Sequence, residues 1–229
     1  MLSSPASALS SPARANLIAV DAGPLSTPLC AAVAVAAPPP PKVSLLTISL
    51  SKLRGSTHAP PSMPLREAVI SGLLTLLGMG ILVGVQYSTP GARATCLFFS
   101  MGSFGATAVL VFAAPAAPLS QPRNVVVGHA LCAIIGVACR IIIADSNVPG
   151  TLPAASALAV ALGVTAMAVL GVTHPPGGAT ALIAVVGGPD VAAMGWWFVL
   201  NAIAGASVLV GVSLLGNNLA PSRRYPLYW

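Results

Sequence analysis

Residues 173–182 read Thr-His-Pro-Pro-Gly-Gly-Ala-Thr-Ala-Leu and separate two strongly apolar runs. Consecutive prolines cannot continue a helix that reaches them, because proline lacks the backbone N–H and its ring clashes with the preceding turn. The stretch therefore predicts that one helix ends near His174 and that another begins directly after it. It also leaves an imidazole and a threonine hydroxyl in the middle of apolar sequence.

Composition indicates where this break lies. Hydrophobic residues make up 56% of the 229-residue chain and charged residues only 6%, and the mean hydropathy is +0.90. Soluble domains carry roughly 25% charged residues, so the chain is predicted to lie in a lipid bilayer. The net charge of +6 comes from scattered basic residues without an aromatic-interleaved basic run, which excludes a nucleic-acid partner.

Residues 1–62 differ from the rest. They are rich in Ser, Ala and Pro, and they carry Arg14, Lys42, Lys52 and Arg54 against a single acid, Asp21. This composition is typical of a disordered organellar transit peptide, and its Ser, Ala and Pro content favours a chloroplast over a mitochondrion. A disordered cytosolic tail is the alternative. Residues 63–229 form the predicted membrane domain.

Five long apolar runs follow, which predicts an all-α, polytopic transmembrane helix bundle. The last run begins with Trp196 and Trp197, residues that anchor helices at a membrane interface. The five predicted helices are Ala68–Gln86, Thr95–Ala114, Val125–Ala144, Ala154–Val172 and Ala192–Leu215.

A short apolar segment, Gly178–Gly188, lies between the last two long helices. It is shorter than the roughly 20 residues of a comfortable crossing, so it is either a re-entrant half-helix or a thin crossing. Basic residues concentrate on the cytoplasmic or stromal side of membrane proteins, and a crossing gives the stronger bias. If the short segment crosses, both ends of the mature chain lie in the stroma, and only Arg93 and Arg140 lie on the other side of the membrane. The basic residues on the stromal side are then Lys52, Arg54, Arg66, Arg123, Arg223 and Arg224. Six crossings are therefore favoured.

An internal repeat adds to this picture. The sequence from Gly105 to Leu110 resembles that from Gly178 to Ile183, and with six crossings the two copies run in opposite directions. Inverted repeats with broken helices are typical of secondary transporters, whose substrate site lies near the midplane between the repeats. The alternative is chance recurrence of small residues, which are common in packed membrane helices.

Four ordered motifs resemble the HPP family of integral membrane proteins, named for its His-Pro-Pro motif. They are Gly105-Ala106-Thr107, Gln121-Pro122-Arg123-Asn124 followed by Gly128-His129, His174 to Thr180, and Asn217-Asn218-Leu219 with the ending from Tyr225 to Trp229. The resemblance covers residues 66–229 and implies a fold with four transmembrane helices. Plastid members are associated with nitrite transport across the chloroplast envelope, so it also implies nitrite as substrate and a role in nitrogen assimilation. The implied location is the chloroplast inner envelope membrane, with another plastid membrane or the mitochondrial inner membrane as alternatives.

The residues themselves are compatible with a small anion. A helix that begins after two prolines presents unpaired N–H groups and the positive end of its dipole, and glycines allow a ligand to approach the backbone. The candidate binding residues are His174, Pro175, Pro176, Gly177, Gly178 and Thr180, with a parallel set in the first repeat at Ser103, Gly105 and Thr107.

His174 and three further polar residues each have a functional and a structural interpretation. His174 can couple anion movement to a proton, or it can cap the preceding helix. Arg123, with Asn124, can attract anions to a vestibule, or it can extend to lipid headgroups. His129 lies deeper in its helix, where it is either part of the site or a helix–helix hydrogen bond.

The sequence carries no protease, P-loop or dinucleotide signature, and we expect neither an enzyme nor a cofactor. Its four cysteines have no paired spacing and are expected to pack rather than to bind metal. Two function classes remain: a transporter of a small anion, passive or linked to protons, and a non-transporting scaffold or assembly factor of a plastid membrane. The expected partners are membrane lipid, nitrite and, with coupling, protons, while a homo-oligomer stays open.

Overall fold

The computed structural model describes residues 59, 61–88, 102–146 and 148–229, and every regular element in these residues is a helix. Residues 1–58 and 60 of the predicted transit peptide and the first part of the predicted helix Thr95–Ala114 lie outside these residues. The elements are α2 (Leu65–Ser88), α3 (Gly102–Ala108), the π-helix η1 (Val109–Ala113), the 3₁₀ turn η2 (Pro118–Ser120), α4 (Pro122–Ile142), the 3₁₀ turn η3 (Ala144–Ser146), α5 (Thr151–Val169), α6 (Pro175–Val186), α7 (Gly188–Met194) and α8 (Trp197–Leu219).

Helices α2, α4, α5 and α8 are each long and apolar enough to cross a membrane. Helices α6 and α7 meet at a 97° bend and form a broken fifth span or a re-entrant loop. The prediction of a short or re-entrant helix after the His-Pro-Pro break is therefore confirmed. The described part of the chain thus has four candidate spans, or five when the bent pair is counted as one.

One predicted boundary is wrong. The apolar run Ala192–Leu215 is divided between α7 and α8, because Gly195 adopts φ +50° between them. Glycine reaches positive φ without the strain that a Cβ atom causes, so the chain turns sharply there although its hydropathy does not change. Trp196 and Trp197 consequently lie at this junction, where both side chains are more than half exposed.

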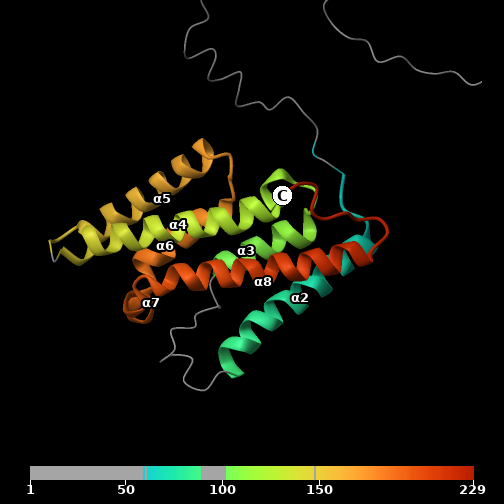
Figure 1. Ribbon diagram of the computed structural model, residues 1–229, viewed down its shortest axis with the longest axis horizontal. Coiled ribbons are helices and arrows are strands. Elements are labelled where there is room, and N and C mark those ends of the chain that lie inside the picture. Colours follow the sequence, from blue (N-terminus) through green and yellow to red (C-terminus); the bar gives the residue numbers. More distant parts are fainter. Residues whose placement is uncertain (1–58, 60, 89–101, 147) are drawn as a thin grey trace, which may run out of the picture. The chain divides into compact units, whose positions relative to one another are not determined.

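The contacts of α2, α3 and α4 parallel those of α5, α6 and α8, which contain the two copies of the predicted repeat. Figure 1 shows that α4 and α8 lie side by side and run in opposite directions. Helix α2 packs on α8 while α5 packs on α4, and α3 contacts α8 while α6 contacts α4. Exchanging the two units reproduces the same set of contacts, as expected for an inverted repeat.

Polar contacts define the two ends of the bundle. At the Arg223 end, Arg223 Nε lies 2.6 Å from Glu67 Oε2, which joins the segment after α8 to the start of α2. Arg123 Nη2 donates to Leu170 O over 3.2 Å and places the start of α4 and the end of α5 there too. At the Arg140 end, Arg140 Nη1 donates to Val185 O over 2.7 Å, at the end of α6. The start of α2 and the end of α8 therefore lie at the same end of the bundle.

The segment after α8 folds back onto the turn before α4. Tyr225 is buried, and its hydroxyl donates to Ser120 O over 2.8 Å, while Leu227 N donates to Gln121 Oε1 over 2.8 Å. Burial raises the pKa of the Tyr225 hydroxyl, which therefore keeps its proton and remains a donor. Two of the four sequence motifs, at Gln121 and at Tyr225, thus contact each other.

Helices α4 and α6 approach closely enough for backbone contact. A Cβ atom on Gly136 would lie 2.6 Å from Ala181 O, so glycine is required at this crossing. Small residues let membrane helices pack in this way. The close crossing fixes how α6 sits on α4 and therefore which side chains of the two helices meet.

Candidate functional site

His129 lies at the centre of a buried polar cluster. Its Nε2 atom is 2.8 Å from Thr107 Oγ1 on α3, and its Nδ1 atom is 2.8 Å from Thr180 Oγ1 on α6. All three side chains are 0% exposed. The two threonines occupy the same position in the repeated Gly-Ala-Thr sequence, so each repeat unit contributes one hydroxyl to the same imidazole.

His174 extends this cluster. Its Nε2 atom lies 3.1 Å from Thr107 Oγ1, and its Nδ1 atom lies 2.8 Å from Leu119 O. The rings of His129 and His174 are 5.0 Å apart between centroids, and His174 is also 0% exposed. We call Thr107, His129, His174 and Thr180 the His–Thr cluster.

One arrangement of protons pairs every imidazole nitrogen of the neutral cluster. Because the Leu119 carbonyl can only accept, His174 Nδ1 carries a proton, and in a neutral imidazole Nε2 then accepts from Thr107. Thr107 in turn accepts from His129 Nε2–H, which leaves His129 Nδ1 to accept from Thr180. The hydroxyls and imidazoles thus form one directed chain from Thr180 to Leu119 in which every member is satisfied.

The threonine hydroxyls also have a second acceptor within reach. Thr107 Oγ1 lies 3.0 Å from Ser103 O, and Thr180 Oγ1 lies 3.2 Å from Pro176 O. A hydroxyl has one proton, so donation to the backbone carbonyl leaves its oxygen free to accept from an additional imidazole N–H. Rotation of these hydroxyls therefore lets the cluster take up a proton without leaving a polar atom unpaired.

Glycines beside the cluster fall into two groups. A Cβ atom on Gly177 would lie 2.9 Å from Gly128 O, and one on Gly128 would lie 2.8 Å from His174 Cβ, so these two residues permit close packing of α4 and α6. By contrast, a Cβ atom on Gly178 or on Gly105 would meet no atom within 4 Å. Gly178 is itself buried, so a Cβ atom at this position would enter space that no neighbouring helix fills.

The start of α6 offers fewer backbone donors than its position suggests. Pro175 and Pro176 have no N–H, and the Gly177 N–H donates to His174 O over 2.8 Å. The expectation of several free N–H groups at this terminus is therefore wrong, because the prolines that begin the helix also remove its first donors. The polar hydrogens at the break belong mainly to side chains.

Arg123 and Asn124 lie outside the cluster. Arg123 is exposed at the Arg223 end, where it donates to Leu170 O. Asn124 is buried, and its Nδ2 atom donates to Thr173 O over 3.0 Å, so it fixes the segment that leads to His174. Two buried side-chain atoms have no hydrogen-bond partner among the described residues: Ser103 Oγ and Asn124 Oδ1.

A family profile described as HPP, transmembrane region, matches residues 60–226. The chain belongs to the HPP transmembrane family. Two transmembrane proteins of Dictyostelium discoideum are similar to it: one is 36% identical over 96 residues, or 42% of this chain and 30% of the relative, and the other is 37% identical over 93 residues, or 41% and 32%. The matched region thus spans about a third of each relative. No solved structure has a significant match.

The sequence motifs of this HPP chain contact one another in the structure. A second polar group is formed by residues that were not predicted as site residues. Arg223 is surrounded by Glu67, Ser71, Phe112 O and Asn217. The π-helix η1 ends beside this group, where Asn217 Nδ2 and Ser213 Oγ donate to Val111 O over 2.9 and 3.0 Å. One signal was available in the sequence: Glu67 directly precedes the apolar run that begins at Ala68.

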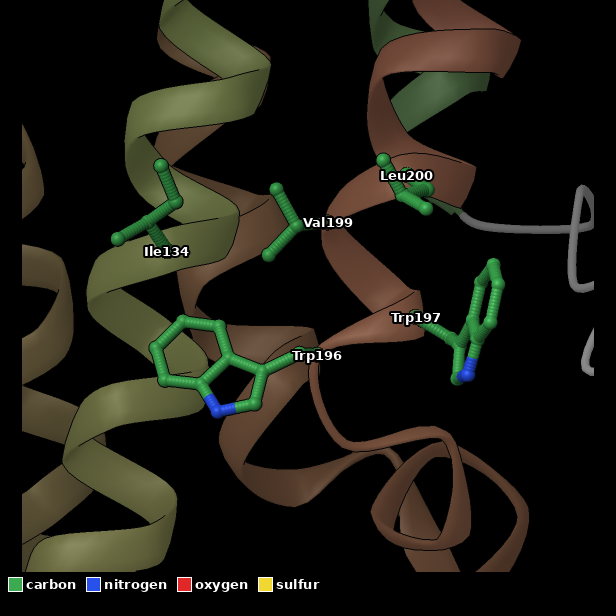
Figure 2. A pocket seen from close by; sticks show the side chains of 5 residues that line it. All are labelled: Ile134, Trp196, Trp197, Val199 and Leu200. Atoms are coloured by element: carbon green, nitrogen blue, oxygen red, sulfur yellow. The ribbon is translucent and has the colours of Figure 1, made fainter.

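An apolar surface groove lies apart from the His–Thr cluster. Figure 2 shows Trp196 beside Ile134 of α4 while Trp197 points away on the other side of the α8 backbone. The groove has a volume of about 490 Å³ and is lined by Ile134, Trp196, Trp197, Val199 and Leu200. It shares no residue with the cluster, and its exposed indoles are placed as the aromatic anchors of a membrane protein are.

Proposed function

We propose that this HPP membrane protein transports a small inorganic anion, nitrite, across the chloroplast envelope into the stroma, with the His–Thr cluster as its binding site. One observation carries the proposal: two oppositely directed short helices bring Thr107 and Thr180 to the two nitrogens of one buried imidazole. Inverted repeats of other transporters place their substrate between such broken helices.

The chemistry of the cluster supports a small anion. Hydroxyl and imidazole N–H groups donate hydrogen bonds without a permanent charge, which is costly to bury in a membrane. A Cβ atom on Gly178, two residues before Thr180 in α6, would meet no atom within 4 Å. Nitrite is small, and its oxygens accept hydrogen bonds from such donors. The four cluster side chains are 0% exposed, so the anion enters after the helices separate at one end.

A proton travels with the anion in this proposal. Imidazole is the side chain that gains or loses a proton most readily near neutral pH. An anion beside a protonated imidazole makes a neutral pair, which lowers the cost of holding either charge away from water. The hydroxyls of Thr107 and Thr180 can rotate toward Ser103 O and Pro176 O when the imidazole gains its proton.

The plastid location rests on the sequence of residues 1–62 and on the distribution of charge. Arg66, Arg123, Arg223 and Arg224 lie at the Arg223 end, and among the described residues the opposite end has Arg140 as its basic side chain. The positive-inside rule then assigns the Arg223 end to the stroma.

A second candidate is a non-transporting scaffold of a plastid membrane, and the groove at Trp196 favours it. Reconstitution separates the two functions. Liposomes with the purified protein are assayed for nitrite and nitrate flux together with an internal pH indicator, and protein-free liposomes measure leakage of nitrous acid. Protein-dependent nitrite flux that is lost in Thr107→Val/Thr180→Val supports the transporter. Thr165→Val is the matched control, because Thr165 is exposed and bonds only to Ala161 O of its own helix. A wild type that matches empty liposomes would refute transport.

A further inference from the structure

We infer that Arg140 and Arg223 are positioning residues that close the two ends of the bundle, each by holding the last turn of one short helix. The inference rests on the proposed function, because it concerns access to the same buried cluster. Among the described residues there are two salt bridges, Arg140–Asp145 and Arg223–Glu67, and they lie at opposite ends.

Arg223 holds the end of the first short helix. Its Nη1 atom donates to Phe112 O over 2.9 Å, and its Nη2 atom donates to Glu67 O over 2.7 Å and to Ser71 Oγ over 2.9 Å. Its Nε atom pairs with the Glu67 carboxylate at 2.6 Å. A single guanidinium therefore joins η1, which continues α3, to the start of α2.

Arg140 holds the end of the second short helix in the same manner. Its Nη1 atom donates to Val185 O over 2.7 Å, in the last turn of α6, and its Nε atom pairs with Asp145 at 3.3 Å. A guanidinium with several fixed donors suits such combined binding of a carbonyl and a carboxylate. The positive charge also complements the negative end of the helix dipole.

The two contacts are equivalent in the repeat. Phe112 follows Thr107 by five residues, and Val185 follows Thr180 by five residues. Each arginine therefore binds the same carbonyl of the repeat unit, one and a half turns beyond the threonine that contacts His129. Movement of either helix end away from its arginine displaces a hydroxyl of the His–Thr cluster, so the state of each end is linked mechanically to the site.

The salt bridges at the two ends of the bundle differ in their exposure to solvent. The side chains of Arg223 and Glu67 are 5% and 20% exposed, whereas those of Arg140 and Asp145 are 20% and 53% exposed. Exposed ion pairs contribute little to stability, and Arg140 has fewer partners. The structure is therefore a closed form in which the Arg140 end opens more readily than the Arg223 end.

Thiol accessibility tests this inference without any flux assay, so its failure is distinct from failure of nitrite transport. The four cysteines are replaced, and Gly178→Cys serves as the reporter, because it is buried and a Cβ atom there meets open space. A membrane-impermeant maleimide is then applied from either side of sealed vesicles. We expect Arg140→Gln to raise labelling several-fold from the Arg140 end only, and Arg223→Gln to raise it from the Arg223 end only.

Matched variants control for charge and for folding. Arg66→Gln removes an exposed charge at the Arg223 end and should leave labelling unchanged. Asp145→Asn leaves the bond from Arg140 to Val185 O in place and should have a smaller effect than Arg140→Gln. Where a glutamine variant fails to yield monodisperse protein, the lysine variant replaces it, since lysine keeps the charge and loses the guanidinium fork. Equal labelling from both sides, or no increase in folded variants, would overturn the inference.

Discussion

Thr107 and Thr180 lie 2.8 Å from opposite nitrogens of the same imidazole, that of His129. The two threonines belong to different copies of the Gly-Ala-Thr sequence and are 73 residues apart. Helices that only pack against each other need no hydroxyl groups at these two positions, because apolar side chains fill the same space equally well. The relationship therefore directs experiments to the hydroxyls.

The Thr107 hydroxyl is predicted to be essential for stability as well as for transport. Thr107→Val keeps the shape of the side chain but removes the group that joins His129 to His174, so both imidazoles lose a partner in a buried site. An unsatisfied buried polar group costs about 1–3 kcal/mol, and thermal unfolding in detergent should detect a loss of this size. Thr107→Ser restores the hydroxyl and should lie close to the wild type. Equal unfolding temperatures for the valine and serine variants would show that the hydrogen bonds add nothing.

The adjacent residues Gly177 and Gly178 are predicted to differ in how well they tolerate substitution by alanine. Gly177→Ala forces a Cβ atom to within 2.9 Å of the Gly128 carbonyl oxygen, which is backbone and cannot move easily. Overpacking of this kind costs about 1–3 kcal/mol. Gly178→Ala meets no atom within 4 Å and should fold normally, yet it adds a methyl group at one of the proposed binding residues and should raise the KM for nitrite. The measurements are unfolding temperature and concentration-dependent flux, and identical behaviour of the two variants would contradict the predicted difference between Gly177 and Gly178.

The pH dependence of flux is predicted from the need for a proton on the cluster. If an imidazole gains a proton when the anion binds, nitrite uptake increases as the pH on the loading side falls, and the vesicle interior acidifies. His174→Gln still offers a donor to Leu119 O but does not titrate, so residual flux should lose its dependence on pH. Stopped-flow recording of an internal pH indicator, corrected with protein-free vesicles, measures both quantities. A His174→Gln variant with unaltered pH dependence would exclude His174 as the proton carrier.

Much of this arrangement was predictable from local sequence. The His-Pro-Pro break is confirmed, since α6 begins at Pro175, and α2, α4 and α5 lie close to the predicted apolar runs because hydropathy responds to lipid exposure. The turn at Gly195 was missed, because a single positive φ leaves no trace in hydropathy. His129 and His174 were both selected as candidates, but their contact depends on the packing of α4 and α6, which no local pattern encodes. That these residues bind an anion stays a prediction.

The π-helix η1 is predicted to depend on the side chains that bind its last carbonyl groups. Its carbonyls at Val111 and Phe112 lack regular helical partners and are instead bonded by Asn217, Ser213, Ser71 and Arg223. Backbone groups at membrane depth must be satisfied by protein or water, so these side chains are what allows the irregular turn to exist. Asn217→Leu keeps a similar volume, but it removes one of the two side-chain donors to Val111 O and an acceptor for Arg223.

We expect Asn217→Leu to destabilise the protein by about 1–3 kcal/mol, the usual cost of leaving buried polar groups without a partner. Ser207→Ala is the matched control, because Ser207 is exposed on the same helix and bonds only to Ile203 O of its own turn. Unfolding in detergent and hydrogen exchange of the amides of residues 109–113 provide two readouts. Faster exchange confined to these residues would locate the effect in η1, whereas unchanged exchange and stability would show that the turn does not depend on Asn217.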